Sequence, residues 1–162
     1  LVIAALWPAC RVVLVEVRNR RAEWLARAAS LLDLDNVTVA ACSVEKVNSF
    51  VADVISARAF APLDRLLALS MRFSTSDTRW VLPKGRSAPQ ELATLAGWQH
   101  SFHVEQSLTD PEGGIIVGRL QGRTGASSRT AEPVPIRRAA SARKRRRSTS
   151  PPPWPPRAGR PC

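Results

Sequence analysis

The chain has 162 residues, 44% of them apolar, which is enough for one domain with a buried core. Its formal charge of +11 is concentrated near the C-terminus: residues 1–120 hold 13 basic and 12 acidic side chains, and residues 121–162 hold 11 and 1. This distribution excludes a uniformly basic protein and indicates a near-neutral domain over residues 1–120 followed by a basic tail over residues 121–162.

The apolar runs and the cysteines bear on where the protein works. The opening run, LVIAALW, has 7 residues, whereas a bilayer span needs about 20, and no later run is long enough either. Cys10, Cys42 and Cys162 are odd in number and contain no CxxC pair, which favours a reducing cytoplasm over a disulfide framework or a zinc site. We therefore expect a soluble, cytoplasmic protein without a metal.

Apolar periodicity predicts alternating helices and strands along residues 1–120. Residues 1–7 are expected to form a helix that Pro8 ends. The runs RVVLVEV and VTVAAC are too dense in apolar residues to alternate, which favours strands buried on both faces, at 11–17 and 37–42. Further strands are predicted at 52–57, 78–84, 101–108 and 113–120, and further helices at 18–34, 43–51, 62–73 and 87–98.

This order predicts an α/β fold with a Rossmann-like, mostly parallel sheet and right-handed crossovers. The short turn TDPEGG joins the last two strands, which should therefore be antiparallel to each other. Such an ending is typical of a class I methyltransferase and unusual for a nucleotide-binding dehydrogenase. From Gln121 the periodicity stops, and the remainder, rich in Arg, Ser and Pro, is predicted to be disordered.

Glu16 lies at the carboxyl end of the first predicted strand, the edge where doubly wound sheets bind ligands. A carboxylate there can accept hydrogen bonds from a ribose diol, and a solvated charge at a strand end explains the residue equally well. In doubly wound folds that bind nucleotides, a glycine-rich turn precedes such an acid by about 20 residues, and for Glu16 that position falls before residue 1.

Polar residues also follow the next two predicted strands at this edge. Val44 and Glu45 come after the second strand, where an adenine ring could lie, although an acid at a helix N-terminus is the simpler explanation of Glu45. Arg58 follows the third strand directly. Candidate groups at three successive strand ends favour a ligand site more than any one of them does alone.

The segment VLPKGRSA places Lys84 and Arg86 on either side of Gly85, before the first turn of a helix. Such a loop can hold phosphate, and solvated charges in a strand-to-helix loop are the alternative. His100 and His103 lie three apart on one predicted strand, so they should point to opposite faces and not share a metal.

Five segments, taken in order, resemble the RsmG/GidB family of bacterial 16S ribosomal RNA methyltransferases, which modify N7 of one guanine. The resemblance covers about residues 1–119, and ISARAF followed by LPKG at this spacing is fairly specific among class I methyltransferases. The segments are RVVLVEVRNRRAEWL, NVTVAACSVE, ADVISARAFAPLDRLL, WVLPKGRSAPQEL and FHVEQSLTDPEGGIIV.

The resemblance implies an S-adenosylmethionine-dependent, monomeric enzyme that acts on 16S rRNA or the small ribosomal subunit. Guanine N7 carries an unprotonated lone pair, so the reaction needs orientation of the reactants and no catalytic acid or base. Lys84 and Arg86 would approach RNA phosphates. The residues that the resemblance assigns to the cofactor are Glu16, Val44, Glu45 and Arg58.

The family pattern begins with a helical segment, a first strand and a loop of the type GSGxGxPG, which this sequence does not contain. The resemblance therefore implies that Leu1 lies just inside the helix that follows the loop, and that the missing strand belongs in the centre of the sheet. Without that strand two edges would be unpaired, so we expect weak cofactor binding and marginal stability.

Two other classes stay open. A non-enzymatic RNA-binding protein would act through the basic tail, which matches nothing in the family and would bind polyanions with little sequence choice. A nicotinamide dehydrogenase would also use Glu16 for ribose, but the antiparallel ending argues against it. Deletion of residues 121–162 should abolish RNA binding in the non-enzymatic class, whereas a methyltransferase should keep its selectivity for the ribosome.

Overall fold

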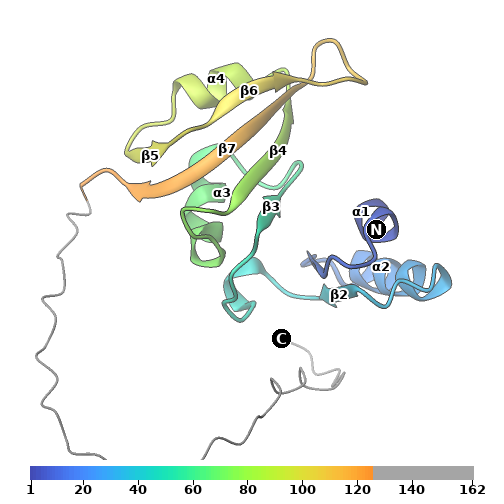
Figure 1. The fold of residues 1–162 in the computed structure, drawn as a ribbon. Coiled ribbons are helices and arrows are strands. Elements are labelled where there is room, and N and C mark those ends of the chain that lie inside the picture. The colour runs from blue at the N-terminus through green and yellow to red at the C-terminus, as the bar shows by residue number, and fades with distance from the viewer. Residues whose placement is uncertain (126–162) are drawn as a thin grey trace, which may run out of the picture. The chain divides into compact units, whose positions relative to one another are not determined.

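The computed structural model describes residues 1–125, so the predicted tail lies outside the described residues except for its first five positions. Helices and strands alternate in nearly the predicted order (Figure 1). The helices are α1 (Val2–Leu6), α2 (Asn19–Leu31), α3 (Leu63–Ser70) and α4 (Ala88–Ala93), with 3-10 turns η1 (Val44–Lys46) and η2 (Met71–Phe73). The strands are β1 (Val12–Val15), β2 (Val37–Ala40), β3 (Val54–Ser56), β4 (Arg79–Gly85), β5 (Trp98–His100), β6 (His103–Gln106) and β7 (Gly114–Arg123).

Local sequence explains the helix boundaries. α1 ends at Leu6, before Pro8, as predicted. Pro62 is the N-cap of α3, next to the helical positions whose N–H groups have no partner in the helix. α2 buries Ala22 and Ala29, whereas Leu32, which follows the helix, is 59% exposed.

The five-stranded sheet has the order β3-β4-β7-β5, and β6 also pairs with β7. β3 and β4 are parallel, and β7 is antiparallel to β4, β5 and β6. Because all three of these strands oppose β7, β7 alone runs against the common direction of this sheet. The predicted parallel sheet with an antiparallel strand near the end is therefore confirmed.

β1 and β2 form a separate parallel pair, with Val12 opposite Val37 and Val15 opposite Ala40. Doubly wound folds have the strand order 3-2-1-4-5, in which a central strand joins two halves. Here the order β2-β1 and the order β3-β4 correspond to those halves, and among the described residues neither β1 nor β3 pairs with a further strand. The division falls where the sequence predicts two unpaired edges.

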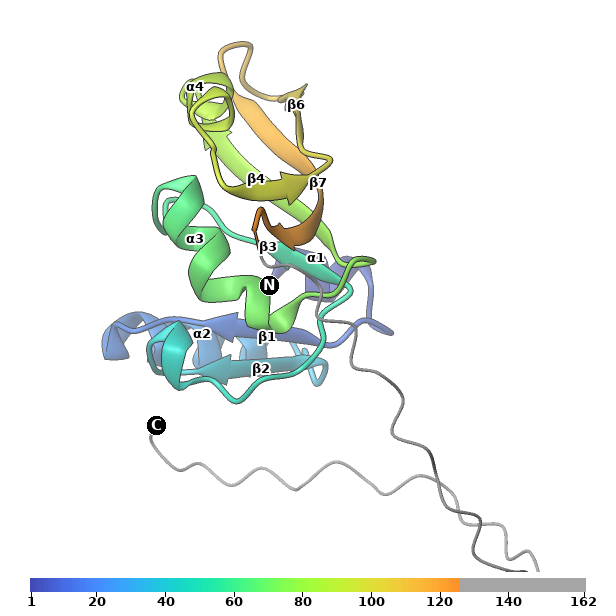
Figure 2. The same ribbon diagram turned by 90° about the vertical axis from the view of Figure 1, so that its left-hand side faces the viewer.

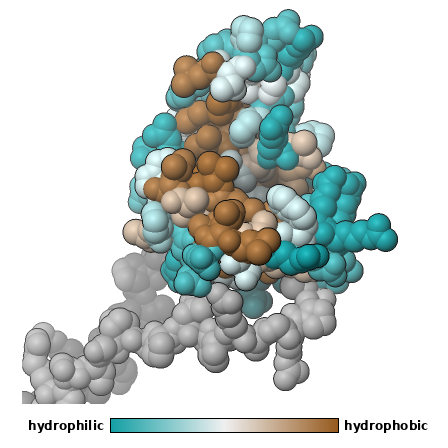
Figure 3. Space-filling model, turned by 90° about the vertical axis from the view of Figure 1, so that its right-hand side faces the viewer, coloured by the Kyte–Doolittle hydropathy of each residue, from teal (hydrophilic) through white to brown (hydrophobic). Residues whose placement is uncertain are grey.

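β1 is not buried on both faces, contrary to the prediction. Val12 and Leu14 are half-buried, but Val13 and Val15 are 39% and 40% exposed, and Thr38 of β2 is exposed as well. Burial on both faces requires a layer on each side, and only one row of β1 side chains is covered. Apolar side chains also gather on the molecular face that carries α1 (Figure 3).

The main core lies between the five-stranded sheet and the two helices α3 and α4, which cover the same face of it (Figure 2). The Nε1–H of Trp98 donates to Asp64 Oδ1 at 2.7 Å and so ties β5 to α3. The fully buried large side chains include Leu63, Leu66, Leu67, Trp80, Leu82 and Ile116. A smaller cluster joins Cys42, Val47 and Phe73.

Two details near the end of the domain differ from the prediction. The segment around Trp98 forms the short strand β5, so His100 and His103 lie on separate strands and not on one. β7 continues through Arg123, three residues past the predicted boundary at 120, because the chain keeps pairing with β5 there. Over residues 1–125 no helix is long and apolar enough to cross a membrane.

Candidate active site at the carboxyl edge of β3 and β4

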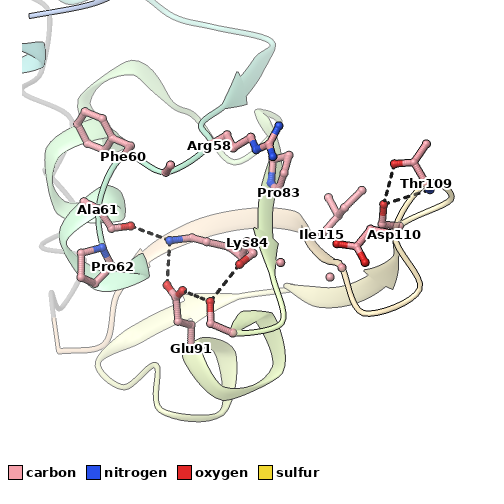
Figure 4. Close-up of a pocket in the computed structure, with 16 residues that line it drawn as sticks. Arg58, Phe60, Ala61, Pro62, Pro83, Lys84, Glu91, Thr109, Asp110 and Ile115 are labelled. Carbon is pink, nitrogen blue, oxygen red and sulfur yellow. Dashed lines mark hydrogen bonds and ion pairs between the residues drawn. The ribbon is translucent and has the colours of Figure 1, made fainter. Parts of the chain in front are cut away.

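An open cavity of about 940 Å³ lies at the carboxyl ends of β3 and β4 (Figure 4). Three segments enclose it: the loop after β3, the passage from β4 into α4, and the turn between β6 and β7. The lining residues are Arg58, Ala59, Phe60, Ala61, Pro62, Pro83, Lys84, Gly85, Ser87, Glu91, Ser107, Thr109, Asp110, Gly113, Gly114 and Ile115.

Lys84 and Glu91 form an ion pair at one side of this cavity. The Lys84 side chain is 8% exposed, and its Nζ lies 2.8 Å from Glu91 Oε2 and 2.7 Å from the carbonyl oxygen of Ala61. Glu91 Oε2 also accepts the backbone N–H of Leu63 at 2.9 Å, and Glu91 Oε1 accepts the Ser87 hydroxyl at 2.8 Å. One carboxylate thus joins β4, α4 and the start of α3.

The environment keeps the Glu91 carboxylate ionised at neutral pH. Burial raises its pKa, but the hydrogen bonds from Lys84 and Ser87, the charge of Lys84 and the Leu63 N–H outweigh that effect. The pKa of Glu91 is therefore held below its ordinary value of 4.5. The Glu91 carboxylate is therefore ionised over the whole neutral range.

Two backbone features shape the mouth of the cavity. Ala59, in the loop after β3, has a φ of 50°, in the left-handed region that non-glycine residues rarely occupy. Gly114 lies so close to α4 that a Cβ there would be 2.6 Å from the Cβ of Ala88. Both the loop and the β4-to-α4 passage are thus held in specific positions.

Glu16 follows β1 directly and is 21% exposed at its side chain. Its Oε1 accepts the backbone N–H of Arg18 at 2.9 Å, at the start of α2, and its Oε2 lies 3.9 Å from a guanidinium nitrogen of Arg21. The carboxylate therefore lies at the predicted sheet edge and keeps acceptor capacity beyond these contacts.

Val44 and Glu45 lie in η1, after β2. The pKa of Glu45 is lowered, first by its own backbone N–H and then by the Ser43 hydroxyl, against a smaller effect of burial. Its backbone carbonyl accepts Arg72 Nη1 at 3.0 Å, which ties η1 to η2. Both the local role of an acid in the first turn and the ligand role remain compatible with this position.

The cavity brings together only two of the predicted site residues, Arg58 and Lys84. Arg86 lies beside it, with a side chain 78% exposed and an ion pair to Glu112. Glu16 and Glu45 do not line it, and neither does Val44. Sequence reasoning missed Glu91, for which the available signal is an acid four residues after Ser87, the N-cap of α4.

Residues 1–125 contain no group of three or more His, Cys, Asp or Glu side chains that could hold a metal ion. The Nδ1 of His100 accepts the backbone N–H of Phe102 at 3.1 Å, and burial lowers the pKa of the imidazole. His100 is therefore neutral at physiological pH and has a structural partner.

Two solved structures share the fold of this chain. A mutant of MtNAS in complex with S-adenosylmethionine superposes with a TM-score of 0.54 and 17% identity, over 73% of this chain and 49% of that one. A putative rRNA methylase from Clostridium thermocellum superposes with a TM-score of 0.51 and 9% identity, over 70% of this chain and 74% of that one. The fold is that of a class I methyltransferase.

Sequence comparison then gives the family. The GidB family, described as rRNA small subunit methyltransferase G, matches residues 1–110, and the chain belongs to it. The Ribosomal RNA small subunit methyltransferase G of Novosphingobium aromaticivorans is 60% identical over 121 residues, covering 74% of this chain and 53% of the relative. The enzyme of the same name from Erythrobacter litoralis is 54% identical over 125 residues, covering 76% of this chain and 60% of that relative. The chain spans about half the length of the curated relatives it matches.

Proposed function

We propose that this chain carries the substrate-facing part of an enzyme that transfers a methyl group from S-adenosylmethionine to N7 of a guanine in small-subunit ribosomal RNA. The observation that carries the proposal is the family match over residues 1–110. The cavity supports it, because it opens at the carboxyl edge of the sheet, where doubly wound folds bind their ligands.

The groups at successive strand ends fit an adenosine-containing donor. Glu16 offers carboxylate oxygens with remaining acceptor capacity, which suits a ribose diol. Val44 and Glu45 follow the neighbouring strand and would contact the adenine side, and Arg58 follows β3 at the cavity. When bound, S-adenosylmethionine supplies a methyl group already activated by its sulfonium charge.

The chemistry asks little of the protein beyond placement. Guanine N7 has a lone pair at neutral pH, so no side chain has to remove a proton, and the task is to align the base with the methyl group. The described cavity fits that task, because its charged pair, Lys84 and Glu91, satisfies its own hydrogen bonds and lies beside apolar walls such as Phe60 and Ile115.

The RNA contacts of Lys84 and Arg86 stay predictions. Arg86 is the more accessible of the two, since its side chain is 78% exposed whereas that of Lys84 is 8% exposed. A phosphate contact by Arg86 would make RNA binding weaken with salt. We propose the small ribosomal subunit in the cytoplasm as the partner and a monomer as the acting form.

A hybrid protein tests the proposal. In the Novosphingobium relative, the matched segment of 121 residues is replaced by the corresponding residues of this chain. The hybrid is incubated with S-adenosylmethionine carrying a labelled methyl group and small subunits that lack the modification. We expect label in 7-methylguanosine of the rRNA. A hybrid that folds and transfers no methyl group, beside an active parent, would contradict the proposal.

A further inference from the structure

The loop between β3 and α3, residues 57–62, forms one wall of the cavity and carries Arg58 and Phe60. Two contacts hold its far end. The Lys84 ammonium donates to the carbonyl oxygen of Ala61 at 2.7 Å, and the Leu63 N–H, just after the loop, donates to Glu91 at 2.9 Å. Both contacts come from the Lys84–Glu91 ion pair, and Figure 4 shows that pair and the bond to Ala61.

This loop needs such support because its backbone is strained. Ala59 has a φ of 50°, in the left-handed region that is unfavourable for a residue with a Cβ. Such a conformation persists only where the surrounding structure determines it. Arg58, Ala59 and Phe60 are all exposed, so their own packing does little to fix the loop.

We propose that Glu91 is a positioning residue. Together with Lys84 it forms a clamp, defined as the Lys84–Glu91 ion pair and its bonds to Ala61 and Leu63, that sets the loop so that Arg58 faces the cavity. The role of Arg58 toward the methyl donor rests on the proposed function, whereas the effect of the clamp on the loop does not.

The geometry distinguishes the clamp from an ordinary surface ion pair. The Arg86–Glu112 pair joins two exposed side chains, 78% and 58% exposed, and bonds to no part of the loop. The clamp has side chains 8% and 24% exposed and makes two bonds to the backbone at residues 61 and 63. Loss of the Glu91 charge should therefore loosen residues 57–63 before it affects other segments.

The first test measures amide hydrogen exchange in the full 162-residue chain. The matched variants are Glu91→Gln and Glu112→Gln, each of which removes one carboxylate charge and keeps the side-chain size. We expect exchange over residues 57–63 to become about tenfold faster in Glu91→Gln, as loss of one charged hydrogen bond allows, with β7 unchanged. Glu112→Gln should leave the loop unchanged.

Two results would overturn the proposal. One is an equal change of the amide exchange rate over residues 57–63 in both variants. The other is a rise of the exchange rate by a similar factor in every segment, which indicates a loss of overall stability and no specific effect on the loop. A second pair of variants keeps the test decisive if Glu91→Gln fails to fold. Lys84→Arg keeps the charge and should leave amide exchange over residues 57–63 slow, whereas Lys84→Met removes the charge and should make it faster. Equal exchange in these two would also refute the clamp.

The enzymatic consequence is read in the hybrid defined above. Glu91→Gln should raise KM for S-adenosylmethionine about tenfold while KM for the small subunit stays constant, because the loop carries the residue proposed to face the donor. Unchanged KM and kcat would reject the positioning role. A hybrid without any methyl transfer would count against the proposed function, whereas the exchange experiment would still decide on the clamp.

Discussion

Removal of the Glu91 side chain should destabilise the domain more than removal of any exposed carboxylate of similar size. The carboxylate accepts hydrogen bonds from Lys84, Leu63 and Ser87 at 2.8–2.9 Å. A charged hydrogen bond contributes about 1.5–3 kcal/mol, and Glu91→Ala leaves the nearly buried Lys84 ammonium without its counter-ion. Because Glu91 is 24% exposed, water replaces part of the loss, and we expect about 3 kcal/mol. Glu112→Ala, at an exposed pair, should cost at most about 1 kcal/mol.

The stability difference between the wild-type chain and Glu91→Ala should depend on pH, and the direction follows from the pKa of Glu91. The pKa of Glu91 is lower in the folded protein than its ordinary value of 4.5, so the folded state holds the proton less tightly than the unfolded state. The stabilisation is then fully present above the unfolded pKa and is lost as the pH falls through the folded one. Urea unfolding curves of the wild-type chain and Glu91→Ala should differ by a constant amount between about pH 6 and pH 8. The gap should narrow below 4.5. A gap that persists in acid, or an equal loss of stability in Glu112→Ala, would contradict the stabilising role of the ionised Glu91.

Three further predictions concern the fold and the donor. A Cβ at Gly118 would lie 2.7 Å from the backbone oxygen of Ser101, whereas Gly122 has similar positive φ and open space around it. Gly118→Ala should therefore lose about 2 kcal/mol more unfolding free energy in urea than Gly122→Ala, and equal losses would contradict the clash. Asn36 Nδ2 donates to three carbonyl oxygens in and just after α1, so Asn36→Ala should lower the free energy of unfolding by about 1–3 kcal/mol. Asn48→Ala, at an exposed position, should lower it little. An equal loss in the two variants would show that the Asn36 hydrogen bonds do not stabilise the fold. Calorimetric titration of the chain alone should show weak S-adenosylmethionine binding, since three of the four proposed donor contacts lie outside the cavity, and micromolar affinity would contradict this.

The sequence was sufficient for the order of elements because local signals determine it. Dense Val runs predict β1 and β2, Pro62 marks the start of α3, and the short turn before Gly114 predicts an antiparallel β7. The burial of β1 was predicted wrongly, because apolar density indicates what a strand could bury and not whether a second layer covers it. The exposed Val13 and Val15 show that difference.

The candidate site was only partly predictable for a related reason. Placement of a residue at a strand end follows from topology, which is why Arg58 and Lys84 were found at the cavity. The partners of a side chain do not follow from topology. Glu91 contacts Lys84 and the N–H of Leu63, 28 positions away, only because α3 and α4 cover the same face of the sheet. A tertiary contact of this kind leaves no periodic signal in one sequence.

The identity of the methylated nucleoside tests the proposed methyl transfer most directly. Small subunits lacking the modification are incubated with labelled S-adenosylmethionine and the hybrid, and the rRNA is digested and separated by chromatography with mass detection. We expect label in 7-methylguanosine alone, in an amount that is reduced by salt and by Arg86→Ala. Label in another base, or at another position of guanine, from a hybrid whose parent yields 7-methylguanosine would contradict it.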